Sequence, residues 1–164
     1  MTTAPPLVDV PAFQRLDPRI ATLWRVSTAL NTLFWAAVVF GVIRFLSLPL
    51  PAWGIVGSLL AAGAAAILFY VPAKWCAWEF QVGDADVRLR HGVFWRTESV
   101  VPHVRIQHVD TAHGPVERGL GLASVIIYTA GTVGGALTIP GLALAEAEVL
   151  RDRLAALSGR DDAV

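Results

Sequence analysis

Two long runs without a charged residue constrain this chain more than any other feature of its sequence. The first run covers eighteen positions, 26–43, and the second covers twenty-nine positions, 45–73. A membrane-spanning helix needs about 20 largely apolar residues, whereas a helix buried in a soluble domain seldom stays uncharged for so long. Prolines interrupt the start of the second run, so its helix is predicted over residues 52–71. The sequence therefore predicts a transmembrane helical hairpin within residues 25–73.

Positive charges flank this hairpin but are scarce in the turn that connects its two helices. Arginines precede the first helix and basic residues follow the second, while Arg44 is the one basic residue of the connection. Because cytoplasmic segments of membrane proteins carry an excess of Lys and Arg, both termini are expected in the cytoplasm, with the hairpin in the cell membrane. Aromatic rings that favour the interface stand at the predicted membrane borders. They belong to Trp24, Trp53, Trp75 and Trp78.

The second predicted helix carries small residues at short intervals. Gly54, Gly57 and Gly63 lie among several alanines. Small residues allow the backbones of two membrane helices to approach closely. One face of this helix is therefore expected to pack closely against another helix, and to contribute to contacts in an assembly.

The composition excludes several classes of protein. Thirteen basic residues balance thirteen acidic ones, so the chain lacks the basic excess of a strongly cationic nucleic-acid-binding protein, and no nucleic-acid partner is expected. Charged residues make up only 16% of the 164 positions, below the roughly 25% of ordinary globular domains. The single cysteine, Cys76, excludes an internal disulfide and a Cys-x-x-Cys zinc site. It lies at the predicted membrane border, where its neighbours are expected to bury it.

The segments outside the hairpin differ in character. Residues 1–24 contain four prolines and are interpreted as an N-terminal cytoplasmic tail. This tail is expected to be loosely ordered, the alternative being a short amphipathic piece on the membrane surface. Residues 74–158 form the predicted cytoplasmic domain, and residues 159–164 a short C-terminal tail.

Within residues 74–158 the apolar pattern changes from helical spacing to alternation. β-branched and aromatic residues alternate with polar ones in short segments separated by Gly, Asp and Pro, which is typical of strands joined by tight turns. Strands are predicted at 77–82, 87–92, 94–101, 104–111, 124–130 and 136–142, with 114–123 as a loop or a single helical turn. Residues 144–157 have helical spacing and are predicted as a helix that covers one end of a small barrel. Its covering residues are expected to be Leu150, Leu154 and Leu157.

Two stretches of this domain carry a resemblance to a known family. They are RHGVFWRTESVVPHVRIQHV at 90–109 and GPVERGLGLASVIIYTAG at 114–131. With the hairpin, the IPGL segment and the EAEVLRDRL helix, the chain resembles the YdbS-like bacterial pleckstrin-homology (PH) domain membrane proteins from about residue 16 to residue 157. The resemblance implies a two-helix transmembrane hairpin followed by a mainly-β PH-like split barrel capped by a C-terminal α-helix. It also implies self-assembly or partner proteins, because relatives often occur beside a larger membrane protein with several copies of the domain.

Residues that commonly serve catalysis or metal binding do not form a recognisable set. His103, His108 and His113 are spaced by five, so neighbouring members point to opposite faces of a strand and cannot converge on one metal ion. These histidines and His91 are expected at the surface or in turns. No serine lies in a Gly-x-Ser-x-Gly elbow, and the glycine-rich stretches match no phosphate-binding loop. No catalytic residue, cofactor or metal is therefore expected.

Arginines are the residues that most suggest a contact surface. Residues 87–109 contain four arginines and a single acid. Near an anionic leaflet each cation is worth about 1 kcal/mol. The candidate contacts for lipid head groups or a partner are Arg88, Arg90, Arg96 and Arg105, the alternative being ordinary solubility of a strand face. Arg118 lies in a glycine-rich turn and is expected to bond backbone carbonyls that hold the turn against the sheet, with a partner contact as the alternative.

These observations predict a membrane-anchored cytoplasmic interaction or scaffold module without catalysis. Anchoring raises the effective concentration of the domain near the bilayer, so weak contacts suffice. The expected partners are the lipid bilayer and either further copies of the chain or a larger membrane protein with repeated PH domains. The alternatives are a sensor of anionic lipids and an accessory subunit whose hairpin binds a membrane complex. An enzyme would need converging titratable groups, which the sequence does not offer.

Overall fold

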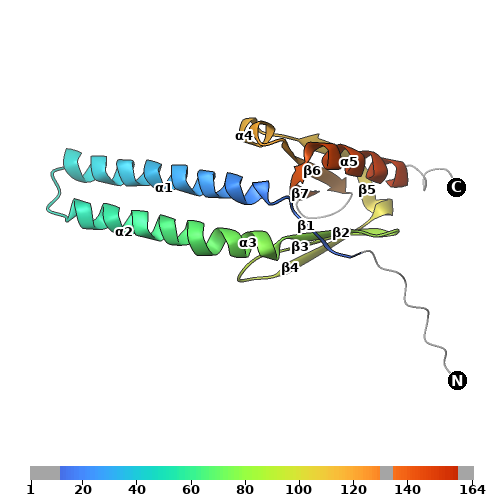
Figure 1. Ribbon diagram of the computed structural model, residues 1–164, viewed down its shortest axis with the longest axis horizontal. Helices are drawn as coiled ribbons and strands as arrows, with labels where there is room; N and C mark the ends of the chain where they lie inside the picture. Colours follow the sequence, from blue (N-terminus) through green and yellow to red (C-terminus); the bar gives the residue numbers. More distant parts are fainter. Residues whose placement is uncertain (1–11, 130–134, 159–164) are drawn as a thin grey trace, which may run out of the picture.

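Two long helices lie side by side and extend from one end of a β-rich domain (Figure 1). The computed structural model describes residues 12–129 and 135–158. α1 spans Arg19–Phe45, and a second continuous helix is built from α2 (Ala52–Ala65), η1 (Ala66–Tyr70) and α3 (Val71–Ala77). Only 11% of the most apolar window of each helix is buried, so neither is the core helix of a soluble domain. The predicted hairpin is confirmed as a pair of long apolar helices.

The second helix contains a wider, π-helical turn near the end that joins the β-rich domain. Pro72 has no N–H with which to donate to the carbonyl four residues earlier. The backbone adapts with a π-helical turn over η1, where the N–H of Val71 bonds to the carbonyl of Ala66, five residues back. The proline therefore changes the pitch of the helix without ending it.

One of the three glycines of the small face packs between the helices. A methyl group added to Gly63 would lie 2.6 Å from Oγ1 of Thr32 on α1. A methyl group on Gly57 would meet nothing within 4 Å, and one on Gly54 would meet only Pro51. The prediction of close packing is thus met at Gly63, whereas the other two glycines make no such close approach to α1.

The segment before α1 is part of the domain, which corrects the expectation of a loosely ordered or surface-lying tail for residues 12–24. Gln14–Arg15 form β1, which pairs antiparallel with β2 (Glu79–Val82), Gln14 opposite Phe80. Leu16 and Ile20 are each 1% exposed and belong to the hydrophobic core. The apolar side chains of this short segment find their burial on a sheet formed much later in the chain. Residues 1–11 and 159–164, predicted as tails, lie outside the described residues.

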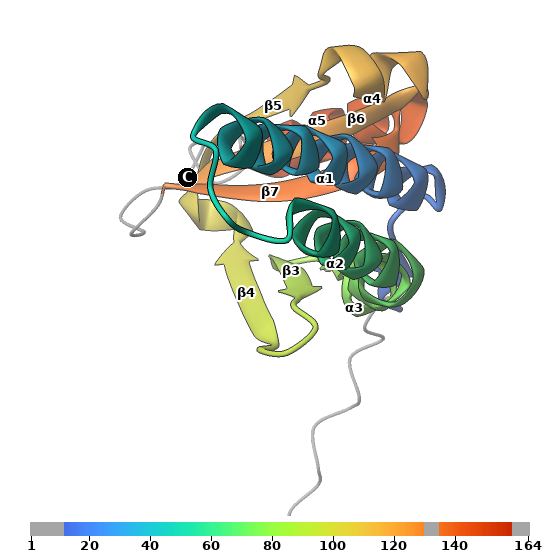
Figure 2. The same ribbon diagram turned by 90° about the vertical axis from the view of Figure 1, so that its left-hand side faces the viewer.

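The domain contains two antiparallel sheets. One has the order β1-β2-β3-β4 and the other β5-β6-β7. The remaining elements are β3 (Asp86–His91), β4 (Thr97–Pro102), the 3₁₀ turn η2 (His103–Arg105), β5 (Ile106–Ala112), α4 (Pro115–Gly119), β6 (Leu122–Thr129), β7 (Ala136–Ala143) and α5 (Leu144–Ser158). Viewed along the helices, α1 lies on the side of the three-stranded sheet and α2 on the side of the four-stranded sheet (Figure 2). Antiparallel sheets closed by a C-terminal helix are consistent with the expected PH-like fold.

The core lies between the two sheets and is covered by α5. Ala147 and Leu154 of α5 are fully buried and belong to the hydrophobic core, and α5 packs against β5 and β6. Leu150 and Leu157 are only half-buried, so Leu154 is the main covering residue among the three that were expected. The predicted strand at 94–101 begins instead at Thr97, because the residues before it form the turn from β3 into β4.

Candidate functional site

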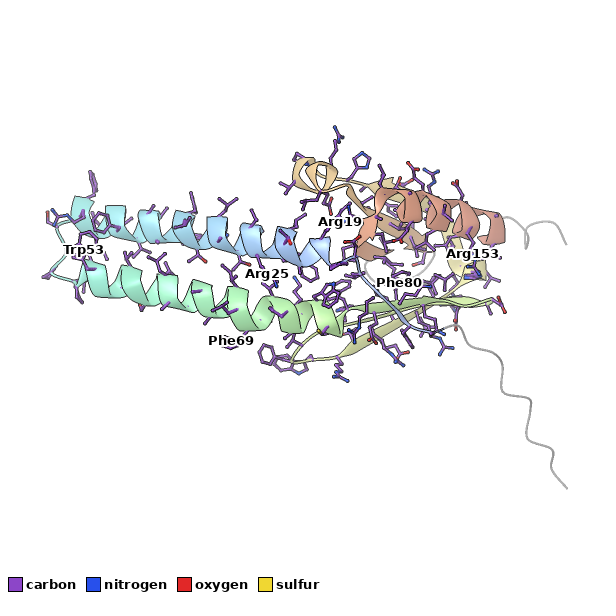
Figure 3. The ribbon with its side chains drawn as sticks, in the orientation of Figure 1. Arg19, Arg25, Trp53, Phe69, Phe80 and Arg153 are labelled. Carbon is purple, nitrogen blue, oxygen red and sulfur yellow. The ribbon has the colours of Figure 1, made fainter. Side chains whose placement is uncertain are left out.

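Three of the four border tryptophans attach the hairpin to the domain. Trp24, Trp75 and Trp78 pack against the hydrophobic core. Nε1 of Trp75 donates a hydrogen bond to the carbonyl oxygen of Leu16 at 3.1 Å, and Nζ of Lys74 lies 4.1 Å from the ring centroid of Trp24. These half-buried rings therefore join the hairpin to the domain. Trp53, at the far end of the hairpin, is 79% exposed (Figure 3).

An arginine fastens the glycine-rich turn to the rest of the domain, but it is Arg19 rather than Arg118. Nη1 of Arg19 donates to the carbonyl oxygen of Leu120 at 3.0 Å, and its Nη2 and Nε donate to the carboxylate of Asp17. These bonds hold the pKa of Asp17 below its usual range. The only sequence signal for this arrangement is the Asp-Pro-Arg start of α1, where the Arg19 N–H also bonds Asp17.

Arg118 itself lies exposed on α4, and its guanidinium has no bonding partner within the described residues. The neighbouring Glu117 makes the hydrogen bonds that hold this turn together. Its carboxylate accepts hydrogen bonds from the N–H of Gly114 at 2.7 Å and from the hydroxyl of Ser124 at 3.1 Å. The structural role expected for Arg118 is therefore wrong, and its side chain stays available at the surface.

The other four candidate arginines do not form one basic patch. Arg88 is paired with Asp86 at 3.0 Å and Arg90 with Glu98 at 3.1 Å, so acids on the same sheet balance both. Arg105 ends η2, at the end of β4 away from the β3–β4 turn, whereas Arg96 lies in that turn. Neither Arg96 nor Arg105 has an ion pair with any residue that the structure describes.

A polar cleft of about 410 Å³ lies beside the last turn of α3. Its charged lining consists of Arg90, Arg96, Glu79 and Glu98, which balance in formal charge. Such a lining gives no preference for an anion. Cys76 also lines the cleft and is exposed, which corrects the expectation that its neighbours bury it.

The histidines occupy two kinds of environment. His91 stacks on Trp78 and His108 on Tyr128, with ring centroids 4.9 and 4.1 Å apart. His103 lies in the 3₁₀ turn η2, one of the two settings expected for the histidines, but it is buried, and burial lowers its pKa. Its Nε2 has no hydrogen-bond partner among the residues that the structure describes. Over residues 12–129 and 135–158, no three His, Cys, Asp or Glu side chains come close enough to hold a metal ion.

A groove of about 740 Å³ lies between the β1–β2 edge of one sheet and the β7–α5 edge of the other. Its apolar lining includes Val82, Leu142 and Val149, the last of which is 68% exposed. The rim carries two basic and two acidic side chains, from Arg15, Arg153, Asp84 and Glu146. Arg153 lies at the end of the domain remote from the hairpin (Figure 3). This groove could not be predicted from the sequence, because it forms only when β1 joins the domain.

Comparisons with known proteins agree with the fold. A family model described as Bacterial PH domain matches residues 19–158. The UPF0699 transmembrane protein YdbS of Bacillus subtilis (strain 168) is 36% identical over 111 residues, which are 66% of this chain and 68% of that protein. Neither the family description nor the name of this relative indicates a catalytic activity. No solved structure matches the chain.

Proposed function

The chain belongs to the bacterial PH domain family, and on that basis we propose that this membrane protein is an anchored interaction module that docks a segment of another protein and carries out no catalysis. The groove between the two sheets is the proposed docking site. The proposed partner is a second membrane protein, either another copy of the chain or a larger protein with repeated PH domains.

The exposed apolar lining of the groove and its polar rim support this proposal. Val149 exposes 68% of its surface in a recess that also contains Val82 and Leu142. Exposed apolar surface rimmed by polar groups is typical of protein interaction sites. The balanced charges of the rim suit a protein segment better than an anionic lipid, and Arg153 lies at the end of the domain away from the hairpin (Figure 3).

The proposed topology has both termini in the cytoplasm. Pairing of β1 with β2 supports it, because the chain enters α1 directly after β1 and returns through α3 directly before β2. This connection supports placing both ends of the hairpin on the same side of the bilayer. The excess of basic residues at these ends over the connecting turn favours the cytoplasmic side.

Two variants at equally exposed valines test the docking site. Val149→Glu places a charge in the groove, and Val104→Glu places one on η2, outside the groove lining, at a residue that is also 68% exposed. Tagged full-length chains are purified from the native membrane in mild detergent, and co-purifying proteins are identified by mass spectrometry. A membrane protein recovered with the wild type and with Val104→Glu, but lost with Val149→Glu, is the expected result.

Three outcomes would count against docking in the groove. Equal recovery of the partner with both variants would place the contact elsewhere. Recovery with a chain that keeps only the hairpin would favour the accessory subunit. Recovery of anionic lipid alone would favour the lipid sensor. Mixing two differently tagged copies distinguishes self-assembly from binding to a different membrane protein.

A second candidate function, recognition of anionic lipid, has one observation in its favour. Arg96 and Arg118 are exposed, and neither pairs with an acid within the part of the chain that the structure describes. α4, which carries Arg118, lies beside α1 near Leu23 and Val26, as the hollow between them shows. Arg118 therefore stands near the hairpin, as does Arg96, which lines the cleft beside α3.

The lipid test must use the full-length chain, because residues 79–164 alone lack β1 and two core residues. The measured quantity is the ratio of anionic to zwitterionic lipid retained on purification. Arg96→Glu combined with Arg118→Glu is expected to lower this ratio if lipid recognition is the function. Arg105→Glu, at the other end of β4, is the control. An unchanged ratio in the double variant would contradict recognition of anionic lipid as the function.

A further inference from the structure

The turn from β3 into β4 presents two large aromatic side chains to the surroundings. Phe94 is 80% exposed and its neighbour Trp95 is 85% exposed. Aromatic side chains of this size bury roughly 150–250 Å² each when they pack, so leaving two adjacent rings in water is unfavourable. Arg96 follows them immediately. These residues, 92–96, are called the aromatic turn below.

The shape of the aromatic turn is set by its first residue. Gly92 has a φ of +107°, a conformation that other residues rarely adopt, and a methyl group there would collide with the carbonyl oxygen of Trp95. On this turn the side chains of Phe94 and Trp95 are 80% and 85% exposed. Both side chains therefore project outward.

The aromatic turn reaches back to the membrane hairpin. The ring of Phe94 stacks on that of Tyr70, with centroids 6.3 Å apart and an interplanar angle of 15°. In Figure 1 the same turn extends under α3 toward the hairpin. Tyr70 belongs to the apolar helix Ala52–Ala77, in which it is itself 45% exposed.

The position of Tyr70 along its helix determines the level along the hairpin at which the aromatic turn lies. Lys74 is the first charged residue after the uncharged run, and Tyr70 precedes it by four residues, about 6 Å along the helix axis. Phe69, beside Tyr70, is 74% exposed on the outer face of the hairpin (Figure 3). A ring stacked on Tyr70 therefore lies at the level where this outer face is apolar.

We propose that the aromatic turn is a third membrane contact, in which Phe94 and Trp95 enter the interfacial region of the same leaflet that holds the domain end of the hairpin. The occupant of this surface is the lipid bilayer. Trp and other amphipathic aromatic side chains favour this region, and a long basic side chain extends its charge to the head groups. Arg96 supplies that charge. This inference does not depend on docking in the groove.

A fluorescent probe at Trp95 measures the depth of the turn in full-length protein reconstituted into phosphatidylcholine–phosphatidylglycerol vesicles. The native thiol is first removed by Cys76→Ser, so that Trp95→Cys can carry an NBD fluorophore alone. Val104→Cys in the same background is the control, because Val104 is exposed on η2, away from the turn. The NBD emission is quenched by nitroxide-labelled lipids or by aqueous iodide.

The probe at Trp95 is expected to be quenched by the nitroxide lipids and several-fold less by iodide than the probe at Val104. Strong quenching by iodide without quenching by lipid would place the turn in water and overturn the proposal. Protection from both quenchers would mean that protein covers the turn, which would also overturn it.

A second variant distinguishes membrane insertion driven by the aromatic turn from insertion driven by the NBD fluorophore. Phe94→Asp is added to the labelled Trp95→Cys chain, because a carboxylate at this position opposes entry into the interface. Loss of the lipid quenching is the expected result. Lipid quenching that persists would show that the dye alone drives insertion, and the proposal would fall. Because Phe94 is 80% exposed, this substitution leaves the core intact.

Discussion

Nη1 of Arg19 lies 3.0 Å from the carbonyl oxygen of Leu120, a residue 101 positions later in the chain. The contact joins the first turn of α1 to the turn that follows α4, while Asp17 holds the other edge of the same guanidinium. The membrane hairpin and the three-stranded sheet are thus fastened to each other at the point where α1 leaves the domain.

Arg19→Lys is expected to lower the thermal stability of the full-length protein in detergent. An ammonium group cannot bond Asp17 through two nitrogens and reach Leu120 as well. Arg118→Lys is the control, since the guanidinium of Arg118 makes no such contacts among the described residues. Equal melting temperatures for the two variants would contradict the role given to Arg19.

Gly141→Ala is expected to destabilise the domain by about 1–3 kcal/mol, as overpacking does. Gly141 has a φ of +63°, and a methyl group there would lie 2.6 Å from the side chain of Ile20. Gly135→Ala is the matched control, because Gly135 has a φ of +62° with nothing within 4 Å. The difference between the two variants in chemical unfolding measures the contact with Ile20, and no difference would argue against it.

Gly63→Val is expected to weaken packing between the two membrane helices, since the added carbons would meet Thr32. Gly57→Val adds the same carbons on an open face and should be neutral. Thermal unfolding of both variants in detergent tests this. If Gly57→Val proved the more damaging, the outward face of α2 would be the packed one.

His103 is expected to make stability depend on pH. Burial lowers its pKa most strongly, Arg153 adds to this effect, and the backbone and carboxylate of Asp84 together with Asp86 oppose it. In the unfolded chain the imidazole titrates near about 6.5. The unfolded state then binds more protons than the folded state below that pH, so the free energy of unfolding falls as the pH decreases through about 6.5.

Chemical unfolding of wild-type protein and His103→Gln between about pH 7.5 and pH 5.5 checks this dependence. The variant should lose the part of the slope that His103 contributes. Parallel profiles for the two proteins would show that the imidazole has the same proton affinity in both states.

A fragment of residues 74–158 is expected not to fold cooperatively. It lacks β1 and the buried side chains of Leu16 and Ile20, each worth about 1.5–3 kcal/mol of burial. Joining residues 12–20 to the fragment through a flexible linker should restore cooperative unfolding, followed by circular dichroism. A fragment that folds equally well without them would show that the first strand is dispensable.

The elements with a long or strong pattern could be predicted from the sequence. The uncharged runs predicted the hairpin, and helical spacing predicted α5 nearly to its ends. β1 could not be found in this way, because two residues show no alternation and the surrounding prolines suggest a loop. Leu16 and Ile20 enter the core only because β2 supplies a partner after the hairpin.

The sequence also could not predict those side-chain roles that depend on contacts between distant positions in the chain. A glycine-rich turn favours an arginine whose guanidinium bonds the backbone carbonyls of the turn. Arg118 is the arginine nearest to this turn in the sequence. The structure brings Arg19 to that turn instead, across 101 positions. Similarly, His103 falls between two predicted strands, where a turn was expected, but the pattern does not reveal that the 3₁₀ turn η2 buries it.

Because β1 and β2 flank the hairpin, assembly of the domain depends on how the chain was inserted during synthesis. A chain whose second helix failed to cross would leave Gln14 and Phe80 on opposite sides of the bilayer, and these strands could never pair. The sheet would lack its first strand, and the core would lack Leu16 and Ile20. In the proposed topology, folding of the domain therefore requires that both helices cross the bilayer, and a chain inserted by one helix alone would leave part of its core exposed.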